Sequence, residues 1–371
     1  MLAIPRRLPA VSRPIAAAVA AVLAVQVALG AVAAQEASPV ASPYVEPPPG
    51  VNDAPVPVEF PRDDGPHDAA IEWWYYTGHL FTADGSRFGF EQVVFKGQST
   101  GLTGYASHVA ITDAAAERFS YDQKLVGEAG VSTAAVGFDL NVGGWLMRGA
   151  NGDDRLRADV GDYAYALALT AEKPATLHDG DGFIDYGNGQ GSYYYSRTRM
   201  AVDGTLVVAG QSLAVTGEAW MDHQWGDFDT FAEGGWDWFS VQLDDGTDLM
   251  LYLINAPDGT PVILDGSLVD RDGSLTILDG PDFSVEPTTN WTSPETGVTY
   301  PSGWEIALPD EDLALTLTPT VADQELDTTR TTGVIYWEGE VTVEGVRAGE
   351  PVGGLGYVEL TGYAERTRGG E

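Results

Sequence analysis

The densest group of residues able to perform chemistry is Asp222-His223-Gln224-Trp225. On an ideal strand, His223 and Trp225 share one face while Asp222 points to the other. A carboxylic acid whose pKa is raised in an apolar pocket can protonate an alkene carbon, and an indole face can stabilise the resulting cation. The alternative is a structural hydrogen-bond pair between Asp222 and His223, because structural networks also perturb pKa values.

Glu72 is a second candidate acid, because it comes directly before Trp73 and Trp74 at the start of a predicted strand. A carboxyl beside two indoles can have a raised pKa. The alternatives are an exposed Glu72, or a cross-strand ion pair between Glu72 and Arg197 or Arg199.

Two other kinds of catalytic centre have weaker support. His79 and His108 lie on predicted strands and could join His223 at a metal ion, but their spacing is not diagnostic, so we expect the three imidazoles not to converge. The run at 97–101 matches the G-x-S-x-G nucleophile elbow with Ser99 as nucleophile. That elbow needs a helix after the serine, and no helix start follows here.

These candidates sit in four aromatic segments, at 72–80, 192–199, 217–226 and 235–243. A strand points alternate side chains to opposite faces, and here both faces carry large rings. Since a soluble sheet usually has one polar face, we expect one face in a core and the other against a cavity or a second sheet. The candidate ligand-contacting residues are Trp73, Trp74, Tyr76, Tyr194, Trp236 and Trp238.

An internal repeat organises these segments. Asp-Gly turns at 84–85 and 245–246 join apolar runs and predict two hairpins. Aligning the hairpins matches Trp73 with Trp236, and the segments 215–220 and 358–363 are similar in kind.

The sequence therefore predicts an all-β protein with two packed antiparallel β-barrel domains of similar plan. We expect the N-terminal domain at 60–228 and the C-terminal domain at 229–371.

The N-terminal residues predict export. Residues 1–34 combine a basic start at Arg6, an Ala-rich apolar run at 15–33 and small residues before a cleavage point, as in a signal peptide. The alternative is an uncleaved membrane anchor. Residues 35–59 are rich in Pro and Ser and predict an extended linker.

Composition excludes several function classes. The chain of 371 residues has no cysteine, which rules out Cys nucleophiles, Cys-based zinc sites and iron–sulfur clusters. Its formal net charge of −36 would repel nucleic acid and anionic membranes. The sequence does not indicate the oligomeric state.

The motifs together resemble the double-lipocalin family, which includes carotenoid 1,2-hydratases (hydroxyneurosporene synthases), kievitone hydratases and secreted AttH-type proteins. The resemblance covers roughly residues 60–366, and its motifs lie at 72–80, 192–196, 219–226, 235–240 and 336–339. It implies two lipocalin-like barrels, no organic cofactor and a hydrophobic ligand.

The resemblance also implies roles at the site. In the hydratases, the His and Trp of the Asp-His-x-Trp motif work with a Tyr and an Asp on the next strand. His223, Trp225 and Tyr252 fit that pattern, but the strand at 249–254 offers no carboxylate.

We therefore expect a cofactor-independent hydratase or isomerase of a carotenoid-like or isoprenoid-like substrate. Asp222 would be the acid, His223 would orient it, Trp225, Trp236 and Trp238 would hold the cation, and Tyr252 would add a hydrogen bond. The alternatives are a non-catalytic carrier of hydrophobic molecules and, third, a secreted serine hydrolase.

Overall fold

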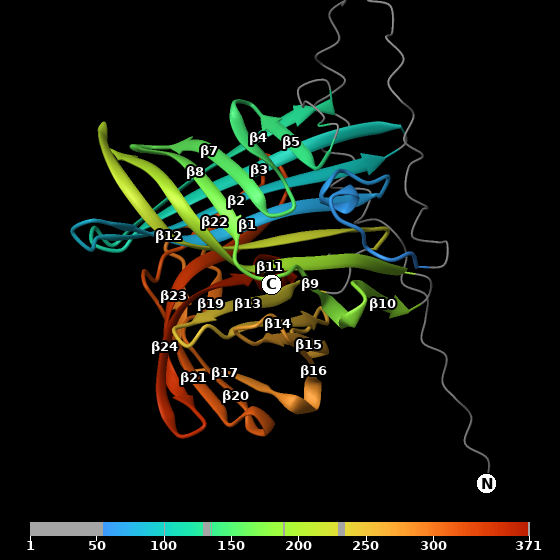
Figure 1. The fold of residues 1–371 in the computed structure, drawn as a ribbon, viewed down its shortest axis with the longest axis vertical. Coiled ribbons are helices and arrows are strands. Elements are labelled where there is room, and N and C mark those ends of the chain that lie inside the picture. The colour runs from blue at the N-terminus through green and yellow to red at the C-terminus, as the bar shows by residue number, and fades with distance from the viewer. Residues whose placement is uncertain are drawn as a thin grey trace, which may run out of the picture.

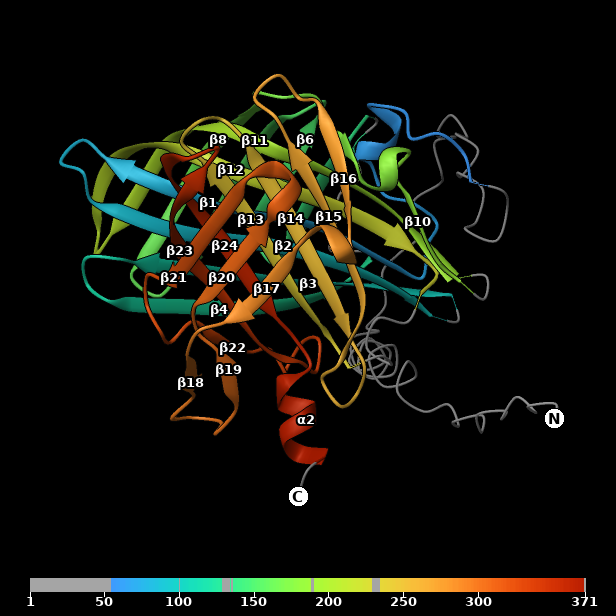
Figure 2. The ribbon, with the colours of Figure 1, turned by 90° about the horizontal axis from the view of Figure 1, so that it is seen from below.

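A computed structural model describes residues 55–99, 101–128, 134, 136–187, 190–228 and 234–369. The predicted signal segment at 1–34 and most of the linker at 35–59 lie outside these residues. The described part folds into two large antiparallel sheets, one of which nearly closes into a barrel. The sheets lie one above the other in Figure 1, and Figure 2 gives the view from below.

The first sheet contains twelve strands. Their bounds are β1 Ile71–Thr82, β2 Arg87–Ser99, β3 Leu102–Asp113, β4 Arg118–Gly127, β5 Phe138–Val142, β6 Trp145–Ala150, β7 Asp153–Val160, β8 Tyr163–Ala171, β9 Thr176–Leu177, β10 Phe183–Gly187, β11 Gln190–Val208 and β12 Gln211–Gly226.

The second sheet contains ten strands. Their bounds are β13 Trp236–Leu243, β14 Asp248–Asn255, β15 Pro261–Val269, β16 Leu275–Asp279, β17 Ser284–Pro287, β20 Trp304–Leu308, β21 Leu313–Pro319, β22 Glu325–Asp327, β23 Ile335–Arg347 and β24 Glu350–Leu360. A separate small sheet pairs β18 Asn290–Thr292 with β19 Thr299–Pro301. The described helices are short: η1 Arg62–Asp64, η3 His178–Gly180, η5 Gly280–Asp282, η6 Pro309–Glu311 and α2 Tyr363–Gly369.

The strand orders of the two sheets correspond. The first runs β4-β3-β2-β1-β12-β11-β8-β7-β6-β5, and the second runs β16-β15-β14-β13-β24-β23-β21-β20-β17. In each half the first hairpin therefore pairs with the last strand of that half. This confirms the predicted all-β fold of two similar antiparallel units, while the domain limits at 60–228 and 229–371 stay predictions.

The Asp-Gly turns lie where the pattern predicts them. Gly85 closes the β1–β2 hairpin at φ 85° and Gly246 closes the β13–β14 hairpin at φ 89°. Because only glycine adopts such φ values at little cost, these turns fix which residues of each hairpin face each other.

Alternation along β1 determines what each sheet face contacts. Trp74 and Tyr76 are fully buried in the core of the first sheet, with Val109 and Leu206. Tyr75 points the other way, into an aromatic cluster that includes Trp238 of the second sheet. The rings on both faces of β1 thus belong to two different cores.

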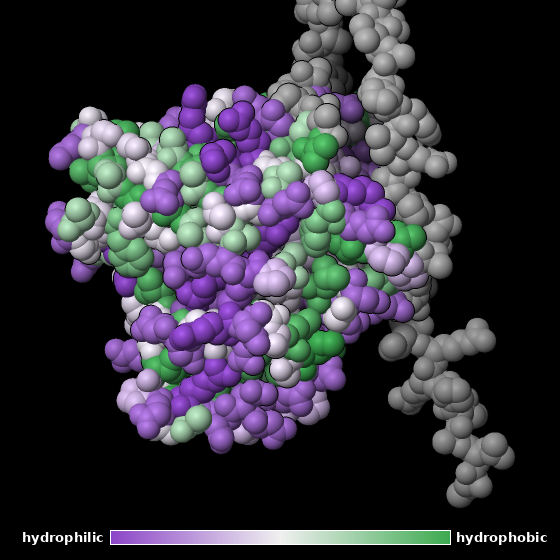
Figure 3. Space-filling view, viewed as in Figure 1, coloured by the Kyte–Doolittle hydropathy of each residue, from purple (hydrophilic) through white to green (hydrophobic). Residues whose placement is uncertain are grey.

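Buried polar contacts also join the sheets. The Thr198 hydroxyl donates to Asp248 at 2.7 Å, and His79 Nδ1 lies 2.8 Å from the Glu340 carboxylate. Hydrophilic residues cover much of the outer face drawn in Figure 3, in keeping with the acidic composition. Within the described residues, none of the helices has the length and apolar character needed to cross a membrane.

Candidate active site between the two sheets

A cavity of about 100 Å³ lies between the two sheets. Aromatic and aliphatic side chains form most of its walls, with a few polar groups among them. The first sheet contributes Ile71, Trp73, Tyr75, Val93, Phe95, Tyr186, Tyr194, Asp222 and Gln224, and the second contributes Trp236, Trp238, Tyr252, Ile254 and Glu359. Of the predicted ligand-contacting residues, Trp73, Tyr194, Trp236 and Trp238 therefore meet at one cavity.

Asp222 is buried and lines this cavity. Its carboxylate accepts hydrogen bonds from the Tyr194 hydroxyl at 2.7 Å, from Trp220 Nε1 at 2.6 Å and from the Ser196 hydroxyl. Burial raises the pKa of Asp222 to about 6, although these three donors oppose the shift. A carboxyl with this pKa can exchange its proton near neutral pH, as general acid–base catalysis requires.

A second carboxyl, that of Glu359 on β24, lines the same cavity from the other sheet. Tyr75 lies opposite Asp222 in the β1–β12 ladder, and Trp238 lies opposite Glu359 in the β13–β24 ladder. Because Tyr75 and Trp238 hold matching places in the repeat, Asp222 and Glu359 do too. Trp236 Nε1 donates to Glu359 at 2.8 Å, and burial raises the pKa of Glu359 to about 7.

Two further acids lie behind this wall. Glu338 is directly opposite Glu359 on β23 and accepts a hydrogen bond from the Tyr75 hydroxyl at 2.7 Å. Glu91 on β2 accepts one from the Tyr336 hydroxyl at 3.1 Å. Among the described residues, the Oε2 atoms of Glu338 and Glu91 have no hydrogen-bond partner. Burial and the neighbouring acids raise the pKa of Glu91 to about 8 and that of Glu338 well above its usual range, so both stay neutral near pH 7.

Tyr252 lies on the cavity wall beside a carboxylate from another strand. The register places Asp265 of β15 directly opposite Tyr252, and the Tyr252 hydroxyl donates to Asp265 at 3.2 Å. Burial raises the pKa of Asp265. The strand at 249–254 itself offers no carboxylate, and the acid beside the tyrosine comes from the neighbouring strand β15.

His223 and Trp225 do not line the cavity, because they lie on the opposite face of β12 from Asp222. Trp225 belongs to the core of the first sheet, and His223 is fully buried with its ring stacked on Trp74 at 4.6 Å. The predicted assembly of Asp222, His223 and Trp225 around one ligand is therefore wrong. The same alternation removes Trp74 and Tyr76 from the ligand-contacting set.

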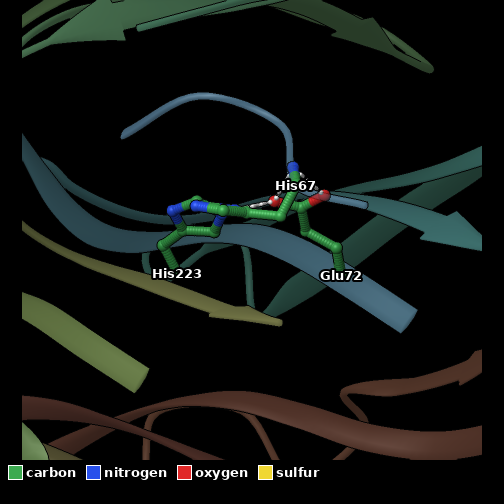
Figure 4. A group of neighbouring side chains, drawn as sticks. All are labelled: His67, Glu72 and His223. Carbon is green, nitrogen blue, oxygen red and sulfur yellow. Dashed lines mark hydrogen bonds and ion pairs between the residues drawn. The ribbon is translucent and has the colours of Figure 1, made fainter. Parts of the chain in front are cut away.

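Glu72 also lies in this inner core, in the group drawn in Figure 4. Its carboxylate is 2.7 Å from His67 Nδ1 and 3.0 Å from His223 Nε2, and Lys96 Nζ lies 3.1 Å from it. Burial alone would raise the pKa of Glu72, but the two histidines outweigh burial and the pKa falls below its usual range. The expectation that Glu72 is an acid with a raised pKa is therefore wrong, and its cross-strand partner is Lys96 rather than an arginine.

His67, Glu72 and His223 bring possible ligand atoms within 4.8 Å of one another. The contacts already made do not fit a metal centre, however. The His67 backbone N–H donates to both oxygens of Glu72, at 3.1 and 3.0 Å, and the Lys96 ammonium stands beside the same carboxylate. A fixed positive charge would repel a metal cation here.

The other histidines belong to separate networks. His79 Nδ1 contacts Glu340, whereas His108 Nδ1 lies 2.8 Å from the Tyr336 hydroxyl and its Nε2 lies 3.0 Å from Thr331. Burial lowers the pKa of His108 to about 3, so that ring is neutral.

Ser99 does not form a nucleophile elbow. It ends β2, and Gly101, at φ 80°, turns the chain directly into β3. A strand–turn–strand hairpin cannot hold the serine as a strand–turn–helix elbow does, so the serine hydrolase alternative loses its structural basis.

A second cavity of about 80 Å³ adjoins the first, since Ile71, Phe95, Trp236 and Glu359 line both. Glu359 therefore stands where the two cavities meet. Sequence reasoning missed Glu359 because it aligned the segment 358–363 with 215–220. In the structure Gly217 pairs with Leu80 and Gly354 pairs with Leu243, so the correct alignment matches Gly354 with Gly217.

Comparison with known proteins agrees with this architecture. An AttH-like family model matches residues 51–363, which is most of the chain. The chain belongs to the AttH-like family. The crystal structure of a protein described as AttH from Nitrosomonas europaea is 34% identical, with a TM-score of 0.75, and the match covers 83% of this chain and 98% of that one.

More distant structures share the AttH-like fold. Kievitone hydratase from Nectria haematococca is 19% identical, with a TM-score of 0.65 and coverage of 84% of this chain and 94% of that one. CghA, solved with Sch210972, is 14% identical, with a TM-score of 0.54 and coverage of 83% and 95%. At these identities the likeness concerns the fold alone. A search of curated protein sequences found no match.

Proposed function

We propose that this AttH-like protein is a cofactor-independent hydratase or isomerase that acts on a carbon–carbon double bond of a hydrophobic, isoprenoid-like substrate. The observation that carries the proposal is a buried carboxyl, Asp222, with a pKa of about 6 in a cavity walled by aromatic rings. Proton transfer to or from carbon needs an ionisable group poised near the working pH, and Asp222 meets that need.

The cavity walls suit the charge that develops in such a reaction. Protonation of an alkene leaves a carbocation, which indole and phenol faces stabilise through their π electrons. Trp73, Trp236 and Trp238 supply those faces. Tyr252 contributes a hydroxyl that is hydrogen-bonded to Asp265. His223 and Trp225 hold β12 from behind, as positioning residues.

Cavity size limits how much of a substrate enters. Pockets for drug-sized ligands measure about 300–1,000 Å³, and a cavity of about 150 Å³ holds one benzene molecule. A cavity of about 100 Å³ therefore suits the terminal group of an isoprenoid chain rather than a whole polyene.

The distant fold relative named as a hydratase adds support to this choice of reaction. A carrier of hydrophobic molecules is the competing function, because the walls are mainly apolar.

We also propose export after cleavage of residues 1–34, supported by their signal-like sequence. Recovery of the native protein with residues 1–34 still attached would contradict that step.

The direct test is to incubate the purified protein with lycopene or squalene, two acyclic isoprenoid alkenes, in ¹⁸O-labelled water. Mass spectrometry detects the added label or a shifted double bond. We expect Asp222→Asn to lower the turnover on the order of 10²–10⁴-fold, the usual contribution of a general acid or base. Ligand affinity, followed by quenching of tryptophan fluorescence, should change little because the apolar walls remain.

Asp237→Asn is the matched control. Burial raises the pKa of Asp237 to about 6 as well, but this residue bonds to Tyr363 and does not line the cavity. Its turnover should equal that of the wild type. Binding of the alkenes without any reaction would favour the carrier, and full turnover by Asp222→Asn would exclude Asp222 as the catalytic group.

A further inference from the structure

Glu359 and Asp222 are equivalent by position but differ in their hydrogen bonds. Asp222 has three donors: the hydroxyls of Tyr194 and Ser196 and the indole N–H of Trp220. Among the described residues, Glu359 has a single donor, the indole N–H of Trp236. Donors stabilise a carboxylate over a neutral carboxyl, so Asp222 is the better carboxylate of the two.

The surrounding network directs the hydroxyl hydrogens toward Asp222. Trp238 Nε1 donates to the Tyr194 oxygen at 3.1 Å, and His178 Nε2 lies 2.7 Å from the Ser196 oxygen. The Tyr194 oxygen is thus engaged as an acceptor, so its hydroxyl is free to donate to Asp222, as the Ser196 hydroxyl also does.

The groups around Glu359 favour its neutral form. Glu338 lies directly opposite on β23, and Asp222 faces it from β12. Among the described residues, no Lys or Arg lines the cavity of about 100 Å³, so no cation in its walls stabilises the Glu359 carboxylate. A carboxyl among other carboxyls retains its proton.

We propose that Glu359 is a second catalytic carboxyl and the proton donor of the reaction, and that Asp222 is the carboxylate that accepts a proton. This inference rests on the proposed function and reverses the role expected of Asp222 from the sequence.

The hydration then balances with water as the only co-reactant. Glu359 gives its proton to one alkene carbon, and its carboxylate remains. The other carbon becomes a cation and bonds to a water oxygen, and a proton of that water passes to the Asp222 carboxylate. The products are an alcohol, ionised Glu359 and protonated Asp222, and exchange with solvent returns the proton before the next cycle. Dehydration follows the same steps in reverse.

The acidities agree with this division. Burial and the charge of Asp222 raise the pKa of Glu359 to about 7, whereas the pKa of Asp222 is about 6. Between these values Glu359 is mainly protonated and Asp222 mainly ionised, which is the pair of states that the step needs.

Deuterium exchange separates the two roles. In D₂O, reversible protonation of squalene by Glu359 places deuterium on the alkene even when water cannot add. We expect Asp222→Asn to lose hydration yet retain this exchange, and Glu359→Gln to lose both. Glu359→Asp, which keeps an acid at the site, should recover part of the exchange. The opposite pattern, with exchange lost in Asp222→Asn and kept in Glu359→Gln, would overturn the assignment.

The pH profile of the reaction is a second readout. Trp236→Phe keeps the ring but removes the donor to Glu359, so the limb of the pH profile that reports this group should move to higher pH. An unmoved limb would contradict the assignment. Asp237→Asn removes a carboxyl that does not line the cavity, so this variant is the control and should react like the wild type. If Glu359→Gln turns over like the wild type while Asp222→Asn is inactive, the role of Glu359 as proton donor is refuted and the proposed function stands. If the wild-type protein itself is inactive, the proposed function is refuted.

Discussion

Two groups of buried acids in this protein behave in opposite ways. The inner group, in the core of the first sheet, contains Asp63 and Glu72, and the His67 imidazole lies within 3.4 Å of both. The outer group, between the sheets, contains Asp222, Glu359, Glu338 and Glu91. Five of these six side chains are buried, and Glu359, at the cavity, is partly buried.

The His67 imidazole makes the difference between the two groups, because the neighbouring Glu72 and Asp63 raise its pKa despite burial. Burial raises the pKa of every member, but in the inner group His67, together with Arg62 or His223, outweighs burial and lowers the pKa of Asp63 and Glu72. Within the part of the chain that the structure describes, the outer group has no such partner, so its pKa values stay raised. Burial alone therefore does not identify a reactive carboxyl. Its pKa stays raised only where no cation lies beside it.

The largest expected loss of folding stability comes from a substitution in the inner group. Glu72→Gln removes the carboxylate and leaves the Lys96 ammonium buried without its counter-ion. Removing one partner of a buried pair costs about 3–5 kcal/mol. Urea unfolding near pH 7 measures the loss, and Arg330→Ala, which breaks an exposed pair with Asp122, should cost less than about 0.5 kcal/mol. Similar losses in the free energy of unfolding for the two variants would contradict the claim that the buried ion pair matters more than the exposed one.

The pH dependence of stability should separate the groups. Glu359 has a folded pKa of about 7, above an unfolded value of about 4.3, so its contribution is complete below pH ~4 and lost as pH rises through 7. Glu72 has a lowered folded pKa, so its contribution holds above pH ~4 and is lost on acidification.

Wild-type stability should therefore decline on both sides of a maximum near pH ~4–5. Glu359→Gln should remove roughly 3 kcal/mol of the decline toward pH 8 and leave the acid side unchanged. Thermal unfolding across pH tests this, and an unchanged alkaline side in the variant would show that Glu359 does not titrate there.

A smaller effect is expected from removing one hydrogen-bond donor of Asp222, which tests why its pKa lies below that of Glu359. Ser196→Ala removes one of the three donors to Asp222, which should cost about 1–2 kcal/mol above pH 7, where the carboxylate is charged. The pKa of Asp222 should rise toward that of Glu359, which ¹³C NMR of labelled aspartate can follow. A fall in this pKa would mean that the hydroxyl does not donate to Asp222.

Much of the architecture followed from local pattern. Asp-Gly turns and the alternation of side chains predicted the two hairpins, and the recurrence of Trp73 at Trp236 predicted two halves of similar plan. Rings on both faces of β1 correctly implied a core on one side and a second sheet on the other.

The alternation of side chains did not show which face of β1 lies in the core and which lines the cavity. Both Trp73 and Trp74 fitted a cavity, and only the fold put Trp74 in the core. His67 precedes β1, outside any periodic segment, and so gave no signal. Glu359 could have been found by following the ladders, since a repeat aligned through Gly217 and Gly354 places it at the position of Asp222.

Asp222 and Glu359 line the cavity from different sheets, and this has a stereochemical consequence. A proton delivered from the second sheet and a water activated beside the first approach the flat double bond from its two opposite faces. We therefore expect hydration by this pair to be an anti addition. The terminal carbon that takes the hydroxyl carries two methyl groups, so one of them must be labelled with ¹³C for the two diastereomers to differ. Reaction of such a labelled isoprenoid alkene in D₂O, with the relative configuration read by NMR, tests this, and a syn product would require both groups to act from the same wall.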